Sequence, residues 1–481
     1  MNIRISSILI LFVTIIFCGC SEQEKVTAPK FESHLVPAIQ VSSEPRFYNL
    51  KDRMEHYQVT GLSIAIVKDG KIVWNEGYGY AQLQDSIKVN SKTVFQAGSL
   101  SKSITALLTM KLVEKGVLKL DQNIEDYLET WEFPKSKYAT KTPITLKSLL
   151  SHTSGVKNNN HFGFPQDEPF PSLNSILNGY KNYKAVSMDT FPGIRYRYSN
   201  TGYAIIQKII EDVTDKTLQE VAHEEIFVPF GMTNTNFSTR VYSETDTQTS
   251  YAFNRKGKRY KQYWFNAANK ASGGLWTTAE DLSKFILGMQ AALQSNQGFI
   301  SQDMVGRMIK PVKAKYGLGF DIKKVQDSTI FYHTGKNRGY TNIMMGMDRE
   351  KNGIVVLTNS DNGGYLFMEI VRGISDIYGW SFSKPEILET IDVPRNILET
   401  YVGTYQLVLE DETYTLKIVL DGNNLQLIDL DENNETYPLR ALSDTKFRDI
   451  DDGEKVDFIK DEKGNIVLLW DEEYRFKRVN E

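Results

Sequence analysis

Two groups of strand-like segments, far apart in the chain, constrain the fold most strongly. Residues 61–77 form two β-rich runs on either side of Asp69-Gly70, a dipeptide that strongly favours a hairpin turn. Strand-like sequence returns between residues 329 and 358, whereas residues 121–310 have the pattern of helix and loop. We therefore predict an α/β (α+β) domain whose antiparallel sheet takes strands from both of its chain ends and encloses a helical part.

Residues 395–481 differ in character from the rest of the chain. Short strand-like runs alternate there with turns such as Asp421-Gly422 and Lys463-Gly464. This segment contains 11 Lys and Arg and 21 Asp and Glu residues, a net charge of −10, which leaves +6 on the remainder of a chain of formal charge −4. We predict a first domain over residues 46–384, a linker, and a small all-β meander or barrel over residues 395–481.

The N-terminus has the pattern of a targeting signal. Arg4 precedes an apolar run from Ile8 to Phe17, which is too short to cross a hydrocarbon core of about 30 Å. Gly19-Cys20 follows, and a Gly-Cys pair at this place resembles a bacterial lipoprotein cleavage site. We expect a leader over residues 1–19, lipidation of Cys20, and a tether over residues 20–45. An ordinary secretory signal with incidental cysteines is the alternative.

Composition excludes several classes of protein. Cys18 and Cys20 are the only cysteines, so the folded part has no disulfide, zinc–thiolate site or cysteine nucleophile. The mean hydropathy of −0.36 excludes a multi-span membrane protein, so a lipid anchor in the bacterial cell envelope is the one membrane contact expected. Mild acidity without a basic domain argues against nucleic-acid binding. No nucleotide or metal motif is present, and we expect no cofactor. The oligomeric state stays open.

Ser99 and Lys102 lie at the start of a predicted helix over residues 100–115, which has apolar residues at helical spacing. Residues three apart on a helix share a face, so the amine would lie beside the hydroxyl. A lysine withdrawn from water has a lowered pKa and can accept the serine proton. The pattern is common by chance, however, and Ser381 and Lys384 match it as well.

Two further motifs follow along the chain. In Tyr198-Ser199-Asn200, the phenol can act as a base or proton relay beside an ammonium group, and the amide can hold a substrate carbonyl. Tyr180-x-Asn182 and Tyr340-x-Asn342 match too, but Tyr198 is at a predicted loop–helix junction, which presents side chains to a cleft. His333-Thr334-Gly335 lies within a predicted strand, where the glycine permits close approach of a peptide-like substrate.

The order Ser-x-x-Lys, Tyr-x-Asn, His-Thr-Gly resembles the penicillin-recognising serine hydrolases, which include class C β-lactamases, D-Ala-D-Ala carboxypeptidases, D-aminopeptidases and related esterases. The resemblance covers about residues 45–380. It extends to residues 95–102 (FQAGSLSK), 149–155 (LLSHTSG), 226–232 (IFVPFGM), 273–281 (GGLWTTAED) and 316–320 (YGLGF). It implies a β-lactamase-like sandwich of an antiparallel sheet and a helical domain, with the active site between them.

The resemblance also implies a role for each motif residue. Ser99 would be the acylated nucleophile, and Lys102 would activate it. Tyr198 would share the proton and protonate the leaving group. Asn200 would orient the substrate, and the backbone N–H groups of Ser99 and Lys336 would form an oxyanion hole.

The strand motif supplies the other side of the expected substrate site and departs from the commonest version of the family. Thr334 and Gly335 match, but His333 replaces the lysine of Lys-Thr-Gly, so the site loses a fixed cation when this histidine is neutral near pH 7. That departure argues against a true β-lactamase. Lys336 replaces a residue that is usually small, and either it or Arg338 could bind a carboxylate. Both side chains could equally be solvated.

Other hydrolase chemistries have less support. His152 is expected to be a histidine at a helix boundary, bonded to backbone, and no Gly-x-Ser-x-Gly or His-Glu-x-x-His motif occurs. The sequence thus predicts a serine hydrolase that forms an acyl-enzyme with a small peptide-like or ester substrate: D-residue peptides, small esters or β-lactam-like amides. The alternative is a non-catalytic penicillin-binding-like module that binds or senses cell-wall fragments.

Overall fold

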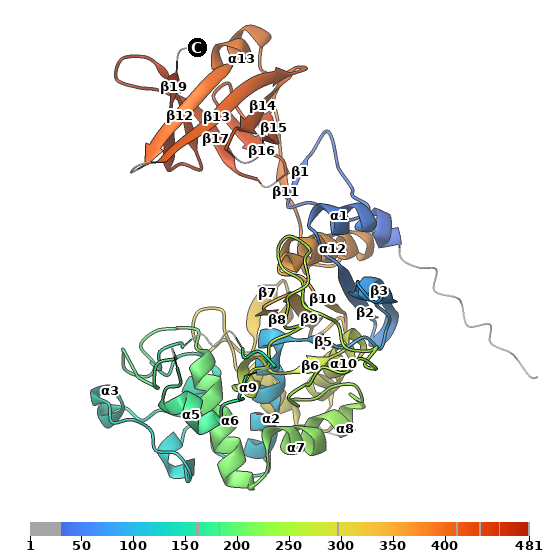
Figure 1. Cartoon of the computed structure of the whole chain (residues 1–481), viewed down its shortest axis with the longest axis vertical. Helices are drawn as coiled ribbons and strands as arrows, with labels where there is room; N and C mark the ends of the chain where they lie inside the picture. Colours follow the sequence, from blue (N-terminus) through green and yellow to red (C-terminus); the bar gives the residue numbers. More distant parts are fainter. Residues whose placement is uncertain are drawn as a thin grey trace, which may run out of the picture.

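The structure, a computed structural model, describes residues 30–479 except 160–162, 167, 182, 296–297, 410–411, 432–433 and 452. The predicted leader, Cys20 and the tether as far as residue 29 lie outside the described residues. Figure 1 shows a larger body of sheet and helices and, at the C-terminal end, a barrel joined to it by a narrow connection. No helix in the described part of the chain is both long and apolar enough to cross a membrane.

A seven-stranded antiparallel sheet forms the centre of the larger body. Its strand order, β4-β3-β2-β10-β9-β8-β7, confirms that both ends of this part of the chain contribute, because N-terminal β2 pairs with β10. In the turn between β2 and β3, Asp69 and Gly70 have φ angles of 51° and 77°. The first part of the strand-like region predicted between 329 and 358 forms a hairpin: β8 pairs antiparallel with β9, and Gly339, with φ 77°, lies in the turn between them. The strands are β2 (Gly61–Lys68), β3 (Lys71–Gln82), β4 (Ile87–Lys88), β7 (Asp321–Val325), β8 (Ser328–Asn337), β9 (Tyr340–Met347) and β10 (Gly353–Thr358).

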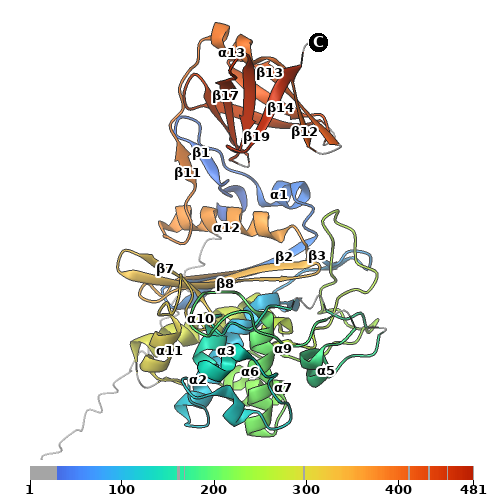
Figure 2. The same cartoon turned by 90° about the vertical axis from the view of Figure 1, so that its left-hand side faces the viewer.

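Helices cover both faces of this sheet. Figure 2 shows the sheet edge-on, with α12 on one side and α2, α6 and α10 on the other. Along β2, Ile64 and Ile66 belong to the core under α12, whereas Ala65 belongs to the core on the opposite face. Successive side chains of a strand point to opposite faces, so this strand is apolar almost throughout because both faces are buried. The helices are α1 (Leu50–His56), α2 (Ser101–Glu114), α3 (Lys137–Lys141), α4 (Leu146–Leu150), α5 (Leu173–Asn178), α6 (Asn200–Thr214), α7 (Leu218–Ala222), α8 (Val228–Phe230), α9 (Lys270–Gly273), α10 (Ala279–Gln294), α11 (Gln302–Met308) and α12 (Gly363–Tyr378).

The C-terminal segment forms a closed, antiparallel barrel, as the all-β prediction anticipated. Each strand pairs with the next, and β12 closes the barrel by pairing with β19, Tyr405 opposite Arg478. A helix that the sequence did not predict, α13 (Arg395–Tyr401), precedes the barrel, and its Leu398 and Tyr401 pack into the barrel core. The strands are β12 (Gly403–Leu409), β13 (Glu412–Asp421), β14 (Asn424–Asp429), β15 (Glu435–Ala441), β16 (Lys446–Asp449), β17 (Lys455–Lys460), β18 (Ile466–Trp470) and β19 (Tyr474–Val479).

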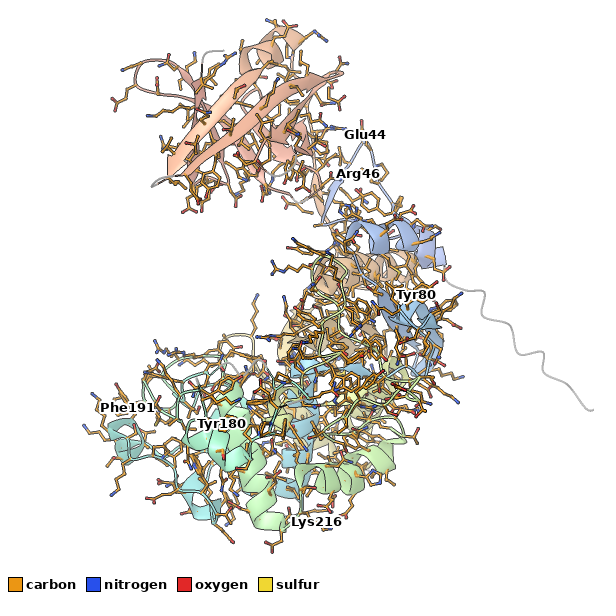
Figure 3. The ribbon with its side chains drawn as sticks, viewed as in Figure 1. Glu44, Arg46, Tyr80, Tyr180, Phe191 and Lys216 are labelled. Carbon is orange, nitrogen blue, oxygen red and sulfur yellow. The ribbon has the colours of Figure 1, made fainter. Side chains whose placement is uncertain are left out.

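The connection between the two bodies is structured. Strands β1 (Ile39–Val41) and β11 (Glu386–Leu388) pair in parallel there. The Arg46 guanidinium lies 2.8 Å from a carboxylate oxygen of Asp451 in the barrel, and Figure 3 shows Arg46 at this junction. The prediction of a tether is therefore wrong for residues 30–45: apolar side chains such as Phe31 of this segment are buried in the core of the larger body.

Candidate active site

Ser99 lies in a 3-10 turn, Gly98–Leu100, that leads directly into α2. The hydroxyl of Ser101 donates a hydrogen bond to the Gly98 carbonyl at 2.6 Å and fixes the turn. Gly98 has φ 58°, and a Cβ at this position would lie 2.7 Å from the backbone nitrogen of Lys336. Only glycine therefore lets the turn approach β8 so closely, and this approach places Ser99 between the helices and the sheet.

Lys102, one turn further along α2, is buried beneath Ser99. Its Nζ lies 3.0 Å from Ser99 Oγ and donates to the carbonyl of Ser272 at 2.7 Å. Burial lowers the pKa of the Lys102 amine well below its ordinary value of 10.5, because a charged amine here would lose its hydration. A neutral Lys102 has a lone pair, which an ammonium group lacks, and can accept the hydroxyl proton of Ser99.

Tyr198 approaches Ser99 from the loop before α6. Its hydroxyl donates to Ser99 Oγ at 2.8 Å. The loop is fixed at the helix start, where the Ser199 side chain caps α6 by accepting from the Gly202 N–H at 3.1 Å. Burial raises the pKa of Tyr198 above its ordinary value, so the phenol keeps its proton at neutral pH. The two shifts favour a protonated Tyr198 beside a neutral Lys102, an arrangement in which the amine is suited to act as a base and the phenol as an acid.

Strand β8 forms the opposite wall of the site. Strand β7 pairs with β8 only as far as Tyr332, so along 333–337 the side of β8 away from β9 pairs with no strand that the structure describes. Gly335 packs against the Ser99 turn, and a Cβ at this position would lie 2.0 Å from the carbonyl oxygen of Ala97. This contact brings the Lys336 backbone beside the Ser99 turn, as an oxyanion hole formed by the N–H groups of Ser99 and Lys336 requires.

His333 is buried, and both of its ring nitrogens are engaged. Nδ1 lies 2.5 Å from the carbonyl oxygen of Thr334, and Nε2 lies 3.2 Å from the hydroxyl of Tyr316. A carbonyl can only accept, so Nδ1 carries the hydrogen and Nε2 accepts from Tyr316. Burial lowers the pKa of His333 to about 3. His333 is therefore neutral near pH 7 and supplies no fixed cation.

His152 makes no contact with Ser99. Its Nδ1 accepts the backbone N–H of Ser199 at 3.1 Å, and its ring lies 4.4 Å from the ring of Tyr198, centroid to centroid. Burial holds the pKa of His152 well below its ordinary value. His152 is therefore a neutral side chain that packs behind Tyr198, not the base of a Ser–His pair.

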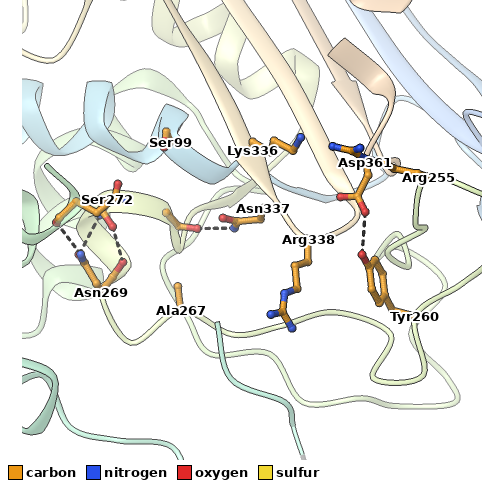
Figure 4. Close-up of a pocket in the computed structure, with 12 residues that line it drawn as sticks. Ser99, Arg255, Tyr260, Ala267, Asn269, Ser272, Lys336, Asn337, Arg338 and Asp361 are labelled. Atoms are coloured by element: carbon orange, nitrogen blue, oxygen red, sulfur yellow. Dashed lines mark hydrogen bonds between the residues drawn. The ribbon is translucent and has the colours of Figure 1, made fainter. Parts of the chain in front are cut away.

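A pocket of about 480 Å³ opens from Ser99 (Figure 4). Of the residues that the sequence analysis named, Ser99, Asn200, Lys336 and Arg338 line it, whereas Lys102, Tyr198, His333, Thr334 and Gly335 do not. Two side-chain amides shape its walls: Asn269 donates to the Asn200 carbonyl at 2.7 Å, and Asn337 donates to the Gly273 carbonyl at 2.9 Å.

Several pocket residues were absent from the sequence prediction. Ser272 and Asn337 directly adjoin stretches that carry the resemblance, so position in the sequence could have pointed to them. Arg255 and Tyr260 belong to a loop with no recognisable motif, and only the fold brings them to the site. The lining residues not predicted from the sequence are Arg255, Tyr260, Ala267, Asn269, Ser272, Gly273, Asn337 and Asp361.

Sequence comparisons agree with this geometry. A family model described as "Beta-lactamase" matches residues 49–370. Penicillin-binding protein 4* of Bacillus subtilis is 25% identical over 437 residues, which cover 81% of this chain and 90% of that protein. Protein flp of Staphylococcus aureus is 25% identical over 307 residues, or 63% of this chain, and the match spans 60% of that protein's length.

Solved structures share the fold. The octameric penicillin-binding protein homologue from Pyrococcus abyssi superposes with a TM-score of 0.60 and 25% identity, covering 89% of this chain and 98% of that chain. D-amino acid amidase from Ochrobactrum anthropi, in complex with D-phenylalanine, superposes with a TM-score of 0.55 and 22% identity, covering 68% of this chain and 97% of that chain. The barrel lies outside the part matched by the family model, but the first of these superpositions extends over most of the chain.

Proposed function

The chain belongs to the β-lactamase family, and from this premise we propose that it is a serine hydrolase that acts through an acyl-enzyme on Ser99. One observation carries the proposal: Ser99 Oγ lies 3.0 Å from Lys102 Nζ and 2.8 Å from the Tyr198 hydroxyl. The nucleophile thus has a neutral base and a proton donor within hydrogen-bonding distance.

Acylation begins when Ser99 Oγ attacks the substrate carbonyl carbon and its proton passes to Lys102. The carbonyl oxygen becomes an oxyanion, which the backbone N–H groups of Ser99 and Lys336 stabilise. Loss of one such donor typically costs about 3–4 kcal/mol of transition-state stabilisation. A backbone hole of this kind acts on any carbonyl substrate and therefore does not decide between an ester and an amide.

Collapse of the tetrahedral intermediate breaks the bond to the leaving group. Tyr198 donates its proton to the departing oxygen or nitrogen and regains one from the protonated Lys102. Water then attacks the acyl-enzyme, with its proton passing to the same groups, and Ser99 is released. Lys102 and Tyr198 thus exchange one proton through each half-reaction, and no metal or organic cofactor has a step in this scheme.

The wall of the site and two relatives support a proposal for the substrate class. The unpaired edge at residues 333–337 is suited to hydrogen bonding with a peptide-like chain. We propose peptide-like amides and esters, with D-residue peptides favoured by similarity to D-amino acid amidase and to penicillin-binding proteins. A neutral His333 makes efficient β-lactam hydrolysis less favourable, because the cation that would attract the lactam carboxylate is missing.

We also propose, from the sequence alone, that Cys20 carries the lipid anchor and holds the enzyme in the bacterial cell envelope. Incorporation of an alkyne-tagged fatty acid that is abolished in Cys20→Ser would support this localisation. Incorporation that persists in Cys20→Ser would contradict it.

A fluorescent fluorophosphonate tests the function against the non-catalytic alternative. We expect covalent labelling of the wild type and none of Ser99→Ala. Ser381→Ala is the matched control, because Ser381 belongs to the second Ser-x-x-Lys pattern and lies far from α2 in the sequence. An unlabelled wild type that also hydrolyses none of a panel of D-Ala-D-Ala peptides, nitrocefin-type lactams and short-chain esters would identify a binding module instead.

A further inference from the structure

We propose that Arg255, Lys336 and Arg338 form a subsite that binds a carboxylate on the acyl part of the substrate. The proposal rests on the serine hydrolase function given above and adds a substrate class to it. The three side chains come from two separate regions: Lys336 and Arg338 from the end of β8 and its turn, and Arg255 from a loop of the helical part. All three are solvent-exposed and line the pocket that opens from Ser99.

The charge of this pocket is positive. The lining contains three cationic side chains and one carboxylate, that of Asp361, which gives a net formal charge of +2. Both oxygens of Asp361 already accept hydrogen bonds: Oδ2 from the Tyr260 hydroxyl at 2.8 Å and Oδ1 from the Gly339 N–H at 2.8 Å. Asp361 therefore binds the turn and the loop together, and its single negative charge still leaves the pocket lining at +2.

The three cations lie on one side of Asn337. Figure 4 shows Lys336, Arg338 and Arg255 on that side, with Ser272 and Asn269 on the other. The guanidinium of Arg338 lies over the ring of Phe265, 4.9 Å from its centroid, which orients a side chain that is otherwise flexible. Lys336 and Arg255 form no salt bridge with any residue that the structure describes. Positive charges gathered beside the nucleophile and turned toward solvent are suited to an anionic ligand.

The proton donor determines which part of the substrate enters this pocket. Tyr198 must face the leaving group in order to protonate it. Tyr198 does not line the pocket, and neither does Thr334 of the strand motif. Ser99 and Asn200 do line it, so the pocket reaches the nucleophile without the proton donor forming part of its wall. The acyl part of the substrate, which stays attached to Ser99 in the acyl-enzyme, therefore occupies the pocket, and its carboxylate meets the cations.

Matched esters with one leaving group isolate this effect. The probes are p-nitrophenyl hydrogen adipate and hydrogen suberate, each compared with its neutral methyl ester. Because the leaving group is constant, any preference arises from the acyl chain. At low ionic strength we expect kcat/KM to be at least about tenfold higher for the charged member, equivalent to roughly 1.4 kcal/mol, for the chain length that reaches the cations. The preference should fall as salt screens the exposed charges.

Variants identify the residues responsible. Arg255→Gln, Lys336→Gln and Arg338→Gln should each reduce the preference, and the triple variant should bring the charged-to-neutral ratio close to one. Arg338→Lys keeps the charge and should retain most of the preference, which separates loss of charge from disturbance of the turn. Lys256→Gln is the control, since it removes a cation from the same loop that does not line the pocket.

Each outcome decides the proposal. Equal rates for charged and neutral esters, or a preference that survives the triple variant, would overturn the subsite. The subsite alone would also fail if neither ester were hydrolysed by a protein that fluorophosphonate labels on Ser99. If that label were absent as well, the serine hydrolase function itself would fail.

Discussion

Replacement of Lys102 by methionine should slow acylation severely and yet stabilise the fold. Methionine keeps most of the side-chain volume but has no lone pair to accept the Ser99 proton. General bases typically contribute about 100- to 10,000-fold to a rate. We therefore expect kcat/KM of Lys102→Met to fall by that factor, which is about 3–5 kcal/mol of transition-state stabilisation.

The effect on stability has the opposite sign. The pKa of Lys102 is lowered in the folded state, so below its ordinary pKa of 10.5 the unfolded chain binds a proton that the native protein does not. The wild-type amine thus lowers the free energy of unfolding at pH 7, and this penalty fades as the pH rises toward the ordinary pKa of 10.5. Lys102→Met should have a higher Tm than the wild type at pH 7, and the gain should shrink at higher pH.

The assay combines stopped-flow acylation with thermal unfolding across pH. Lys111→Met is the matched control, because Lys111 lies on the same helix and pairs with Glu114 at 2.8 Å, away from Ser99. The control should keep its acylation rate and gain no stability at pH 7. A Lys102→Met enzyme that acylates within tenfold of the wild type, or that is less stable than it at pH 7, would refute the assignment of a buried, neutral base.

Three more predictions test neighbouring groups. Tyr198→Phe should slow cleavage of an alkyl ester or amide by about 100-fold or more. Cleavage of a p-nitrophenyl ester should slow much less, because p-nitrophenolate leaves without a proton. Equal losses of kcat/KM for the two kinds of substrate would contradict the role of Tyr198 as proton donor. Since the pKa of His333 is lowered to about 3, the free energy of unfolding should fall as the pH drops from about 6.5 toward 3. In urea titrations, His333→Gln should lose less stability over this pH range than the wild type. An equal loss in both proteins would contradict a neutral His333. Gly335→Ala should cost about 1–3 kcal/mol and most activity, because its Cβ would lie 2.0 Å from the Ala97 carbonyl oxygen. Gly306→Ala in α11, whose Cβ would meet nothing within 4 Å, should instead be neutral or stabilising. If denaturant melts showed Gly306→Ala to be less stable than Gly335→Ala, β8 would not be in close contact with the Ser99 turn.

The sheet was predictable because its signals are local. Asp69-Gly70 fixes a tight turn, and apolar runs of strand length flank it, so the pairing of β2 with β3 can be read from neighbouring residues. The pairing of β1 with β11 joins residues 39–41 to 386–388, and three-residue strands leave no periodicity to detect. The apolar residues of 30–45 are interspersed with polar ones at no regular spacing, so only the core that receives them distinguishes this segment from a tether.

The residues of the site also fall into two groups: those that a local sequence pattern predicts, and those that only the fold brings together. Ser99 and Lys102 are three residues apart on a helix, so their contact follows from helical geometry. Tyr198 reaches Ser99 from a position 99 residues further along the chain, and only the combination of motifs placed it there. Arg255 and Tyr260 carry no motif, and their place in the pocket depends on how a long loop folds back on β8. The chemistry of the nucleophile was therefore accessible from sequence, whereas most of the residues that line the substrate pocket were not.

The mass of a trapped intermediate tests the central claim most directly. Rapid acid quench of the wild type during turnover of p-nitrophenyl hydrogen suberate, followed by peptide mapping, should locate the suberoyl group, without p-nitrophenol, on Ser99. Turnover without such an adduct, or an acyl group on any other residue, would contradict an acyl-enzyme formed by the Ser99, Lys102 and Tyr198 arrangement.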